Sequence, residues 1–282
     1  MASLIQPLTT SNHDRDRAGL RYVYPVVSRR AGGVSIGINL NPNNACNWAC
    51  IYCQVPDLTR GGPPPLDLGL LELELNRMLD DIQHGDFMTT QVPEAGRHLM
   101  DIAFSGNGEP TSAPEFAEAV ALVIRVMSQR GLDDLKLRLI TNGSLVQRSY
   151  VKGGLSLMAT VNGEVWFKVD AIAPERAMVV NGVNQTPAVV LSRLQACAAV
   201  VPTWIQTCMM EVDGQVPSAT ETAAYLELLA QVKDAIQGVL LYGLARPSMQ
   251  PGGARIRALP SEWMMEMGRR IEALGVPVQL SP

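Results

Sequence analysis

Three of the chain's five cysteines lie close together in the segment NNACNWACIYCQV. Cys46, Cys50 and Cys53 have the spacing C-x3-C-x2-C. Thiolates at such short spacing bind metal ions or iron–sulfur clusters, whereas disulfides are rare in a reducing compartment. A closed structural zinc site takes four protein ligands. The segment therefore supplies one ligand too few for such a site.

Two sources of a fourth ligand remain open from the residues alone. One is a distant side chain, but no candidate has the paired spacing of a second zinc knuckle. The other is an exogenous ligand on a cubane iron–sulfur cluster, because three cysteines leave one iron open. An open metal position is typical of catalytic sites. The distant candidates are Cys197, Cys208, His13, His84 and His98.

Short apolar runs alternate with helical patterns along the chain and predict the elements that position these thiols. Strands that alternate with helices form parallel βαβ units with right-handed crossovers. We therefore expect an α/β fold on a parallel sheet, either open or closed into a full or partial barrel. The expected strands cover residues 33–40, 98–106, 135–143, 164–171, 204–214, 238–247 and 276–280, and the expected helices cover 68–82, 113–131, 144–158, 187–200, 218–235 and 260–275.

Polar and glycine-rich segments follow the predicted strands. They are FSGNGEPT, TNGS, KVDA, MMEVDG and GLARP, and the cysteine segment follows the first strand in the same way. The carboxyl ends of parallel strands form the ligand-binding edge of such sheets. The sequence therefore predicts one site, assembled from all these segments.

The cysteine spacing, with Tyr52 before the last cysteine, resembles the signature of the radical S-adenosylmethionine superfamily. A second motif, SGNGEPT at residues 105–111, is similar to that family's Gly-Gly-Glu-Pro element, with Asn107 in place of the first glycine. This form with asparagine is similar to that of the wyosine-synthesis-like branch and its uncharacterised iron–sulfur oxidoreductase relatives. The resemblance extends from about residue 33 to residue 245.

The resemblance implies a particular organisation of the chain. It predicts a partial parallel (βα)6 barrel of the radical S-adenosylmethionine type, with an N-terminal extension and a short C-terminal tail. The expected parts are an arm at residues 1–32, the core at 33–247, and a helix and short strand at 248–282 that pack on the core.

The resemblance also implies cofactors and a reaction. Cys46, Cys50 and Cys53 are expected to ligate three irons of a [4Fe-4S] cluster, and S-adenosylmethionine is expected to bind the fourth iron. Reductive cleavage of this cosubstrate gives methionine and a 5′-deoxyadenosyl radical, which abstracts hydrogen from a substrate. The cofactor supplies the hard chemistry and the protein supplies orientation.

The same resemblance assigns further residues to the cosubstrate. The glycines of the second motif let backbone groups approach its methionine amino group, and Glu109 is expected to accept a hydrogen bond from that ammonium. Tyr52 is expected near the adenine, and Asp170 is the best candidate for a ribose or substrate contact. The expected cosubstrate-binding residues are Tyr52, Gly106, Asn107, Gly108, Glu109, Asn142, Ser144 and Asp170.

Substrate contacts are assigned by position at the later strand ends. Asp170 and Lys168 lie close enough in sequence to pair with each other, and an arginine at a strand end can clamp a carboxylate. The isolated Cys197 and Cys208 are expected to be buried small hydrophobes. The substrate candidates are Lys168, Gln206, Thr207, Glu211, Tyr242 and Arg246.

Composition limits the partners. The net charge is −4 and the pI is about 5.5, so a nucleic-acid partner, which favours a basic surface, is not favoured. The apolar runs are far shorter than the roughly 20 residues of a membrane span, and the first residues lack a signal-peptide core. We expect a cytoplasmic protein. The resemblance implies a flavodoxin- or ferredoxin-type electron donor.

The motifs and the composition are compatible with three functions. The leading one is a radical enzyme that acts on a small-molecule or peptide-like substrate. The second is a tRNA-base-modifying enzyme, suggested by the wyosine-like form of SGNGEP. The third is a non-catalytic metal-binding protein, which the SGNGEP segment disfavours because a scaffold needs no clamp for an amino acid.

Overall fold

The computed structural model describes residues 8, 19–28 and 32–281. Its central element is a curved sheet with the strand order β1-β2-β5-β6-β7-β8-β10-β12. β1 is antiparallel to β2, and every other pair of neighbours is parallel. The strands are β1 (Val23–Ser28), β2 (Gly33–Asn39), β5 (Leu99–Ser105), β6 (Lys136–Thr141), β7 (Gly163–Lys168), β8 (Thr203–Cys208), β10 (Gly238–Tyr242) and β12 (Val278–Ser281).

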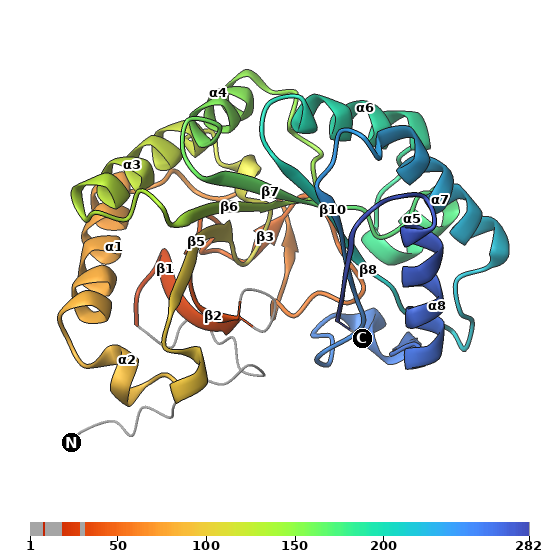
Figure 1. The fold of residues 1–282 in the computed structure, drawn as a ribbon, viewed down its shortest axis with the longest axis horizontal. Helices are drawn as coiled ribbons and strands as arrows, with labels where there is room; N and C mark the ends of the chain where they lie inside the picture. The colour runs from red at the N-terminus through yellow and green to blue at the C-terminus, as the bar shows by residue number, and fades with distance from the viewer. Residues whose placement is uncertain (1–7, 9–18, 29–31, 282) are drawn as a thin grey trace.

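The helices cover the outer, convex side of this sheet, so the sheet curves inward as a partial barrel (Figure 1). All seven residues of β2 are buried, as expected for a parallel strand that is covered on both faces. The helices are α1 (Leu68–Gln83), α2 (Phe87–Thr90), α3 (Phe116–Gln129), α4 (Ser149–Met158), α5 (Pro174–Asn181), α6 (Pro187–Ala198), α7 (Ala219–Val232) and α8 (Ser261–Glu272).

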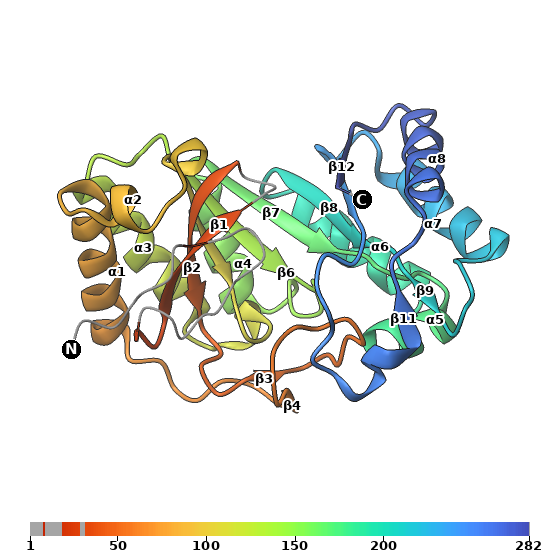
Figure 2. The ribbon, with the colours of Figure 1, turned by 90° about the horizontal axis from the view of Figure 1, so that it is seen from below.

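Short elements lie outside the main sheet. Two small sheets pair β3 (Ala45–Cys46) with β4 (Thr59–Arg60) and β9 (Glu211–Val212) with β11 (Ile256–Arg257). The described residues also contain short 3₁₀ helices, η1 (Glu94–Gly96), η2 (Pro110–Ser112) and η3 (Pro251–Arg255). Figure 2 shows β3, β4, α5, β9 and β11 along the same side of the molecule.

The predicted fold class is confirmed. All six predicted core strands are parallel neighbours in chain order, and the short strand near the C-terminus pairs with β10. β1 and β12 are the two ends of the strand order, so the sheet is an open, partial barrel. The predicted helix at 218–235 is α7, which begins with a capping box formed by Ser218 and Glu221.

The sequence misplaced several element boundaries and missed one helix. The helix expected at 144–158 begins only at Ser149, because residues 142–148 form turns in which side chains bond to nearby backbone. The strand expected at 204–214 ends at Cys208, and Glu211 lies in the separate β9. α5 was not predicted at all. None of the helices in the described part of the chain is long and apolar enough to cross a membrane.

The arm expected at residues 1–32 contributes a strand to the main sheet. β1 runs antiparallel to β2, and Tyr24 lies opposite Gly37. The Tyr24 ring fills the space above that glycine, because a Cβ at Gly37 would meet the ring at 2.1 Å. The Tyr24 hydroxyl lies 2.7 Å from Ser105 Oγ, at the end of β5. Most of the remaining arm lies outside the described residues.

Gly37→Ala is expected to lower the free energy of unfolding by about 1–3 kcal/mol, the usual cost of overpacking a filled site. Chemical denaturation measures the change. The matched background is Tyr24→Ala, in which the same Gly37→Ala change is expected to cost much less because the ring is gone. Equal costs in the two backgrounds would show that Tyr24 does not cover Gly37.

Candidate functional site

The three clustered cysteines lie on a loop, residues 45–55, that follows β2; we call it the cysteine loop. β3 and β4 pair Cys46 with Arg60. Asn41 Nδ2 donates to the Ala45 carbonyl over 3.0 Å. A Cβ at Gly108 would meet that same carbonyl at 2.1 Å. Only a glycine therefore allows the SGNGEPT turn to approach the start of the cysteine loop this closely.

Asn47 ties the cysteine loop to the segment after β6. Its Nδ2 donates to Ser144 Oγ over 2.8 Å, and its Oδ1 accepts from Asn142 Nδ2 over 2.8 Å. Asn142 Oδ1 in turn accepts from the Ser144 backbone and hydroxyl. The predicted residues Asn142 and Ser144 thus lie beside the cysteines, and Asn47 is a site residue that the sequence did not reveal.

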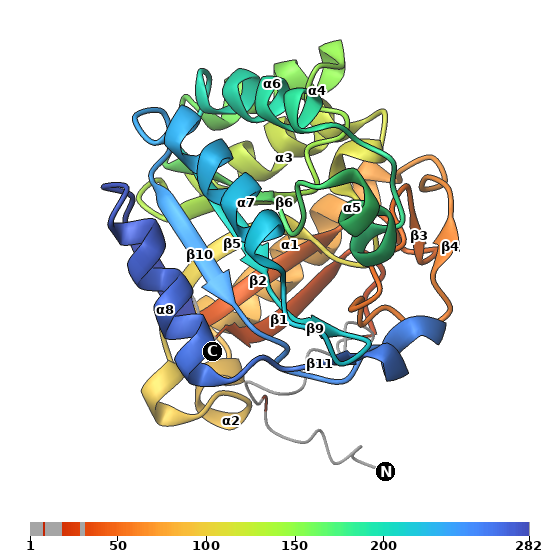
Figure 3. The same cartoon turned by 90° about the vertical axis from the view of Figure 1, so that its right-hand side faces the viewer.

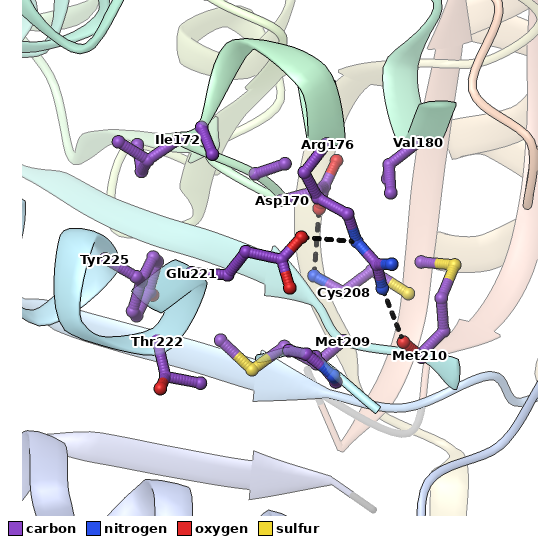
Figure 4. A pocket seen from close by; sticks show the side chains of 13 residues that line it. Asp170, Ile172, Arg176, Val180, Cys208, Met209, Met210, Glu221, Thr222 and Tyr225 are labelled. Atoms are coloured by element: carbon purple, nitrogen blue, oxygen red, sulfur yellow. Dashed lines mark hydrogen bonds and ion pairs between the residues drawn. The ribbon is translucent and has the colours of Figure 1, made fainter. Parts of the chain in front are cut away.

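Asp170 ties the other side of the loop to the segment after β7. Its carboxylate accepts from Tyr52 Oη over 2.5 Å and from the Cys208 backbone N–H over 2.9 Å. It also forms an ion pair of 2.9 Å with Lys168. Figure 4 shows Asp170 and its bond to Cys208 beside a small pocket. The predicted pairing of Asp170 with Lys168 is therefore present.

Lys168 lies between two aromatic rings. Its Nζ is 5.0 Å from the centroid of Tyr52 and 4.9 Å from that of Tyr242, and it donates to Tyr242 Oη over 2.5 Å. Burial by itself lowers the pKa of this lysine, but the Asp170 carboxylate and Tyr242 outweigh burial and raise the pKa above its ordinary value. Lys168 therefore stays protonated and holds both tyrosines by cation–π contacts.

The segment after β10 binds the far end of the cysteine loop. Ser248 Oγ donates to the Ile51 carbonyl over 2.7 Å, and the Met249 backbone N–H donates to the Cys53 carbonyl over 2.9 Å. Gln250 Nε2 donates to the Val55 carbonyl over 2.7 Å. The sequence did not assign any of these donors to the site.

The SGNGEPT turn is held against the end of β2. Gly106 has φ +129°, and a Cβ there would meet Asn39 Oδ1 at 2.5 Å. That same Asn39 oxygen accepts hydrogen bonds from the backbone N–H groups of Asn107 and Asn41, over 3.0 Å and 3.1 Å. The Asn107 side chain donates to Asn44 Oδ1 over 2.6 Å. The turn and the cysteine loop are thus one hydrogen-bonded unit.

Glu109 joins the ends of β5 and β6. Its carboxylate is buried and accepts from the Thr111 backbone and hydroxyl, the Thr141 hydroxyl and the Asn142 backbone N–H, at 2.5–3.1 Å. Burial raises the pKa of this carboxyl, and the four donors oppose that shift. These contacts give Glu109 a positioning role, and its expected contact with an ammonium stays a prediction.

The three cysteines of the loop are free and partly exposed as whole residues, whereas Cys197 and Cys208 are buried as expected. Burial of the sulfur raises the pKa of Cys46 to about 11 and that of Cys50 to about 12. Among the described residues, no three His, Cys, Asp or Glu side chains form a group that could hold a metal ion.

Three free thiols on one loop suit an iron–sulfur cluster, in which each cysteine sulfur binds one iron. Two of the sulfurs already accept weak hydrogen bonds. The Trp48 backbone N–H lies 3.4 Å from Cys46 Sγ, and Asn181 Nδ2 lies 3.2 Å from Cys50 Sγ. Such donors stabilise the negative charge of a metal-bound thiolate.

A cavity of about 230 Å³ adjoins the SGNGEPT turn. Ser105, Gly106 and Gly108 line it, together with the predicted residues Gln206 and Arg246. A buried ion pair of Asp101 and Arg138 lines it as well. The other substrate candidates do not line this cavity. Lys168 donates a hydrogen bond to Tyr242, and the Thr207 hydroxyl lies 2.7 Å from that of Tyr225. Glu211 lies in β9, outside the main sheet.

The fold is that of radical S-adenosylmethionine enzymes. It is similar, with a TM-score of 0.62 and 14% identity, to a radical SAM methyltransferase from Sphaerobacter thermophilus, over 92% of this chain and 68% of that one. It is also similar to Streptococcus suis SuiB bound to S-adenosylmethionine, with a TM-score of 0.51 and 10% identity, over 90% of this chain and 49% of that one. At these identities the likeness establishes the fold.

Curated proteins that match this chain in sequence do so over about half of it. A UPF0026 protein of Helicobacter pylori is 28% identical over 150 residues, which are 52% of this chain and 42% of that protein. GTPase Obg of Brachyspira hyodysenteriae is 26% identical over 152 residues, which are 52% of this chain and 19% of that protein. The matched part is thus less than half the length of either relative. No family model matches the chain.

Proposed function

We propose that this chain is a radical S-adenosylmethionine enzyme. The observation that carries the proposal is the cysteine loop: three free thiols, fixed by residues from the ends of five parallel strands, lie beside a glycine turn in a radical SAM fold. Cys46, Cys50 and Cys53 would hold a [4Fe-4S] cluster. When bound and reduced, such a cluster supplies the electron that cleaves the sulfonium carbon–sulfur bond of S-adenosylmethionine, giving methionine and a 5′-deoxyadenosyl radical.

The chain's own residues bind and orient in this proposal. The turn from Gly106 to Gly108 presents backbone groups to the methionine part of the cosubstrate. Tyr52, held by Asp170, is proposed to lie near the adenine. Asn142 and Ser144 are proposed to contact the ribose side. The electron donor is expected to be a flavodoxin- or ferredoxin-type protein.

The cavity beside the turn is proposed to hold the substrate. Its volume of about 230 Å³ suits a small molecule or one side chain of a peptide. The radical takes one hydrogen atom from a carbon of that substrate, so 5′-deoxyadenosine and a substrate radical form in equal amounts. Gln206 and Arg246, which line this cavity, are proposed to contact polar groups of the substrate. The kinship of SGNGEPT with the wyosine-like branch stays a sequence-based prediction.

The proposal predicts cleavage of S-adenosylmethionine even without the substrate. The protein is reconstituted anaerobically with iron and sulfide, reduced with dithionite and incubated with S-adenosylmethionine. Mass spectrometry is expected to detect 5′-deoxyadenosine and methionine in equal amounts, and protein treated without iron is the control. Bound cluster without any 5′-deoxyadenosine would refute the proposed activity.

A further inference from the structure

α5 lies between β7 and α6 and is fixed to the barrel by Arg176. This side chain donates to the Met210 carbonyl over 3.0 Å and forms an ion pair of 3.7 Å with Glu221 at the start of α7 (Figure 4). Pro174 begins the helix, and Gly182 ends it in the left-handed conformation with φ +66°. The helix therefore has a defined position relative to the strand ends.

The carboxyl end of α5 is the platform on which the cysteine loop rests. The Ala49 backbone N–H donates to the Asn181 carbonyl over 3.0 Å, and the Ile51 N–H donates to the Val180 carbonyl over 2.8 Å. These two bonds flank Cys50 on either side and satisfy carbonyls that a helix end leaves without intrahelical partners. Figure 3 shows α5 between the barrel and the loop that carries β3 and β4.

The Asn181 side chain reaches Cys50 directly. It is 0% exposed, and its Nδ2 lies 3.2 Å from Cys50 Sγ and 3.0 Å from Asp170 Oδ2. Its Oδ1 has no hydrogen-bond partner within the described part of the chain. A flipped amide would turn this oxygen toward the Asp170 carboxylate, which only accepts. Asp170 therefore fixes the orientation that directs an N–H toward sulfur.

A buried amide oxygen without a partner calls for an explanation. The same orientation that leaves Oδ1 without a partner gives Cys50 a donor, and no other orientation of the amide does so. A donor to a cluster thiolate stabilises the extra negative charge of the reduced cluster, and hydrogen bonds to sulfur are among the factors that set cluster potentials.

We infer that Asn181 is a positioning residue that raises the reduction potential of the cluster through its hydrogen bond to Cys50, and that Asp170 orients it. This inference rests on the proposed function, because it needs a cluster on the cysteine loop. It adds a residue from α5, an element that carries none of the sequence motifs. Through Asp170, Asn181 also connects Cys50 with Tyr52 and Lys168.

The test is a redox titration of the reconstituted protein, followed by electron paramagnetic resonance. Asn181→Leu keeps the approximate size and removes both N–H donors. At a fixed solution potential, its ratio of reduced to oxidised cluster is expected to fall about tenfold, a shift of about 59 mV to more negative potential for one electron. Thr203→Val is the matched control, because the Thr203 hydroxyl bonds to the buried, non-ligating Cys197 and to the Val201 carbonyl.

Equal midpoint potentials of wild type and Asn181→Leu would overturn the inference. If Asn181→Leu fails to hold a cluster, a measurement on the wild type decides. Pulsed electron paramagnetic resonance of the reduced cluster, without S-adenosylmethionine and with ¹⁵N in the asparagine side-chain amides, is expected to show a ¹⁵N coupling. Its absence contradicts the inference.

The two proposals fail in different ways. A wild type that holds a cluster but forms no 5′-deoxyadenosine refutes the activity and leaves the potential shift measurable. A wild type that cleaves S-adenosylmethionine, with an Asn181→Leu variant of unchanged potential, refutes only the role of Asn181.

Discussion

Replacing Cys46, Cys50 or Cys53 with alanine is expected to abolish cluster binding and the formation of 5′-deoxyadenosine. Loss of a residue that only supports a metal ligand costs about 10- to 100-fold in affinity or activity, so loss of a ligand is expected to cost more than about 100-fold. Iron analysis and mass spectrometry of the product measure both effects.

Cys197→Ala is the matched control for these variants. Cys197 is equally a free thiol, but it lies on α6 and is buried in the core. It is expected to keep full iron content and activity. A Cys50→Ala variant with wild-type iron content would show that the cysteine loop does not hold the cluster.

The cysteine variants are expected to fold like the wild type. Side chains outside the thiols anchor the loop, notably Asn47, Tyr52 and Ser248. Circular dichroism of each variant therefore separates loss of the cluster from loss of the fold.

Glu109→Gln is expected to lower the free energy of unfolding by about 2–3 kcal/mol, because it replaces a charged acceptor of buried hydrogen bonds. The new amide group would place donors opposite the donors of Thr141 and Asn142. For a chain of this size, the expected fall in Tm is about 4–10 °C. Differential scanning calorimetry of the protein without cluster measures it.

Glu72→Gln is the control for Glu109→Gln. Glu72 pairs with Arg125 on the exposed side of α1 and α3, and exposed ion pairs contribute little. No resolvable change in Tm is expected. A Glu109→Gln variant as stable as the Glu72→Gln variant would show that the buried network does not join β5 to β6.

The sequence predicted the sheet well because its signal is local. Apolar runs such as LRLIT in β6 and VWFK in β7 are buried strands, and the polar segments after them lie at one edge of the sheet, as their positions implied. β1 was missed because only four residues separate it from β2, too few for the helix that the expected alternation requires. Nothing in the alternation of strands and helices indicates such a strand.

The contacts that complete the site were not predictable from local patterns. Asn181 and Cys50 are 131 residues apart, and Ser248 and Ile51 are 197 residues apart. α5 has only eight residues and begins with a proline, so it resembled a loop. The cysteines and the glycine turn, by contrast, are recognisable because their chemistry requires particular residue types at fixed spacing.

The cysteine loop is proposed to leave one iron of a [4Fe-4S] cluster open for S-adenosylmethionine. Electron paramagnetic resonance of the reduced cluster, recorded before and after addition of S-adenosylmethionine, tests it most directly. A change in the g values is expected, because the cosubstrate becomes a ligand of the open iron. An identical spectrum, with four irons bound per chain, would contradict the account.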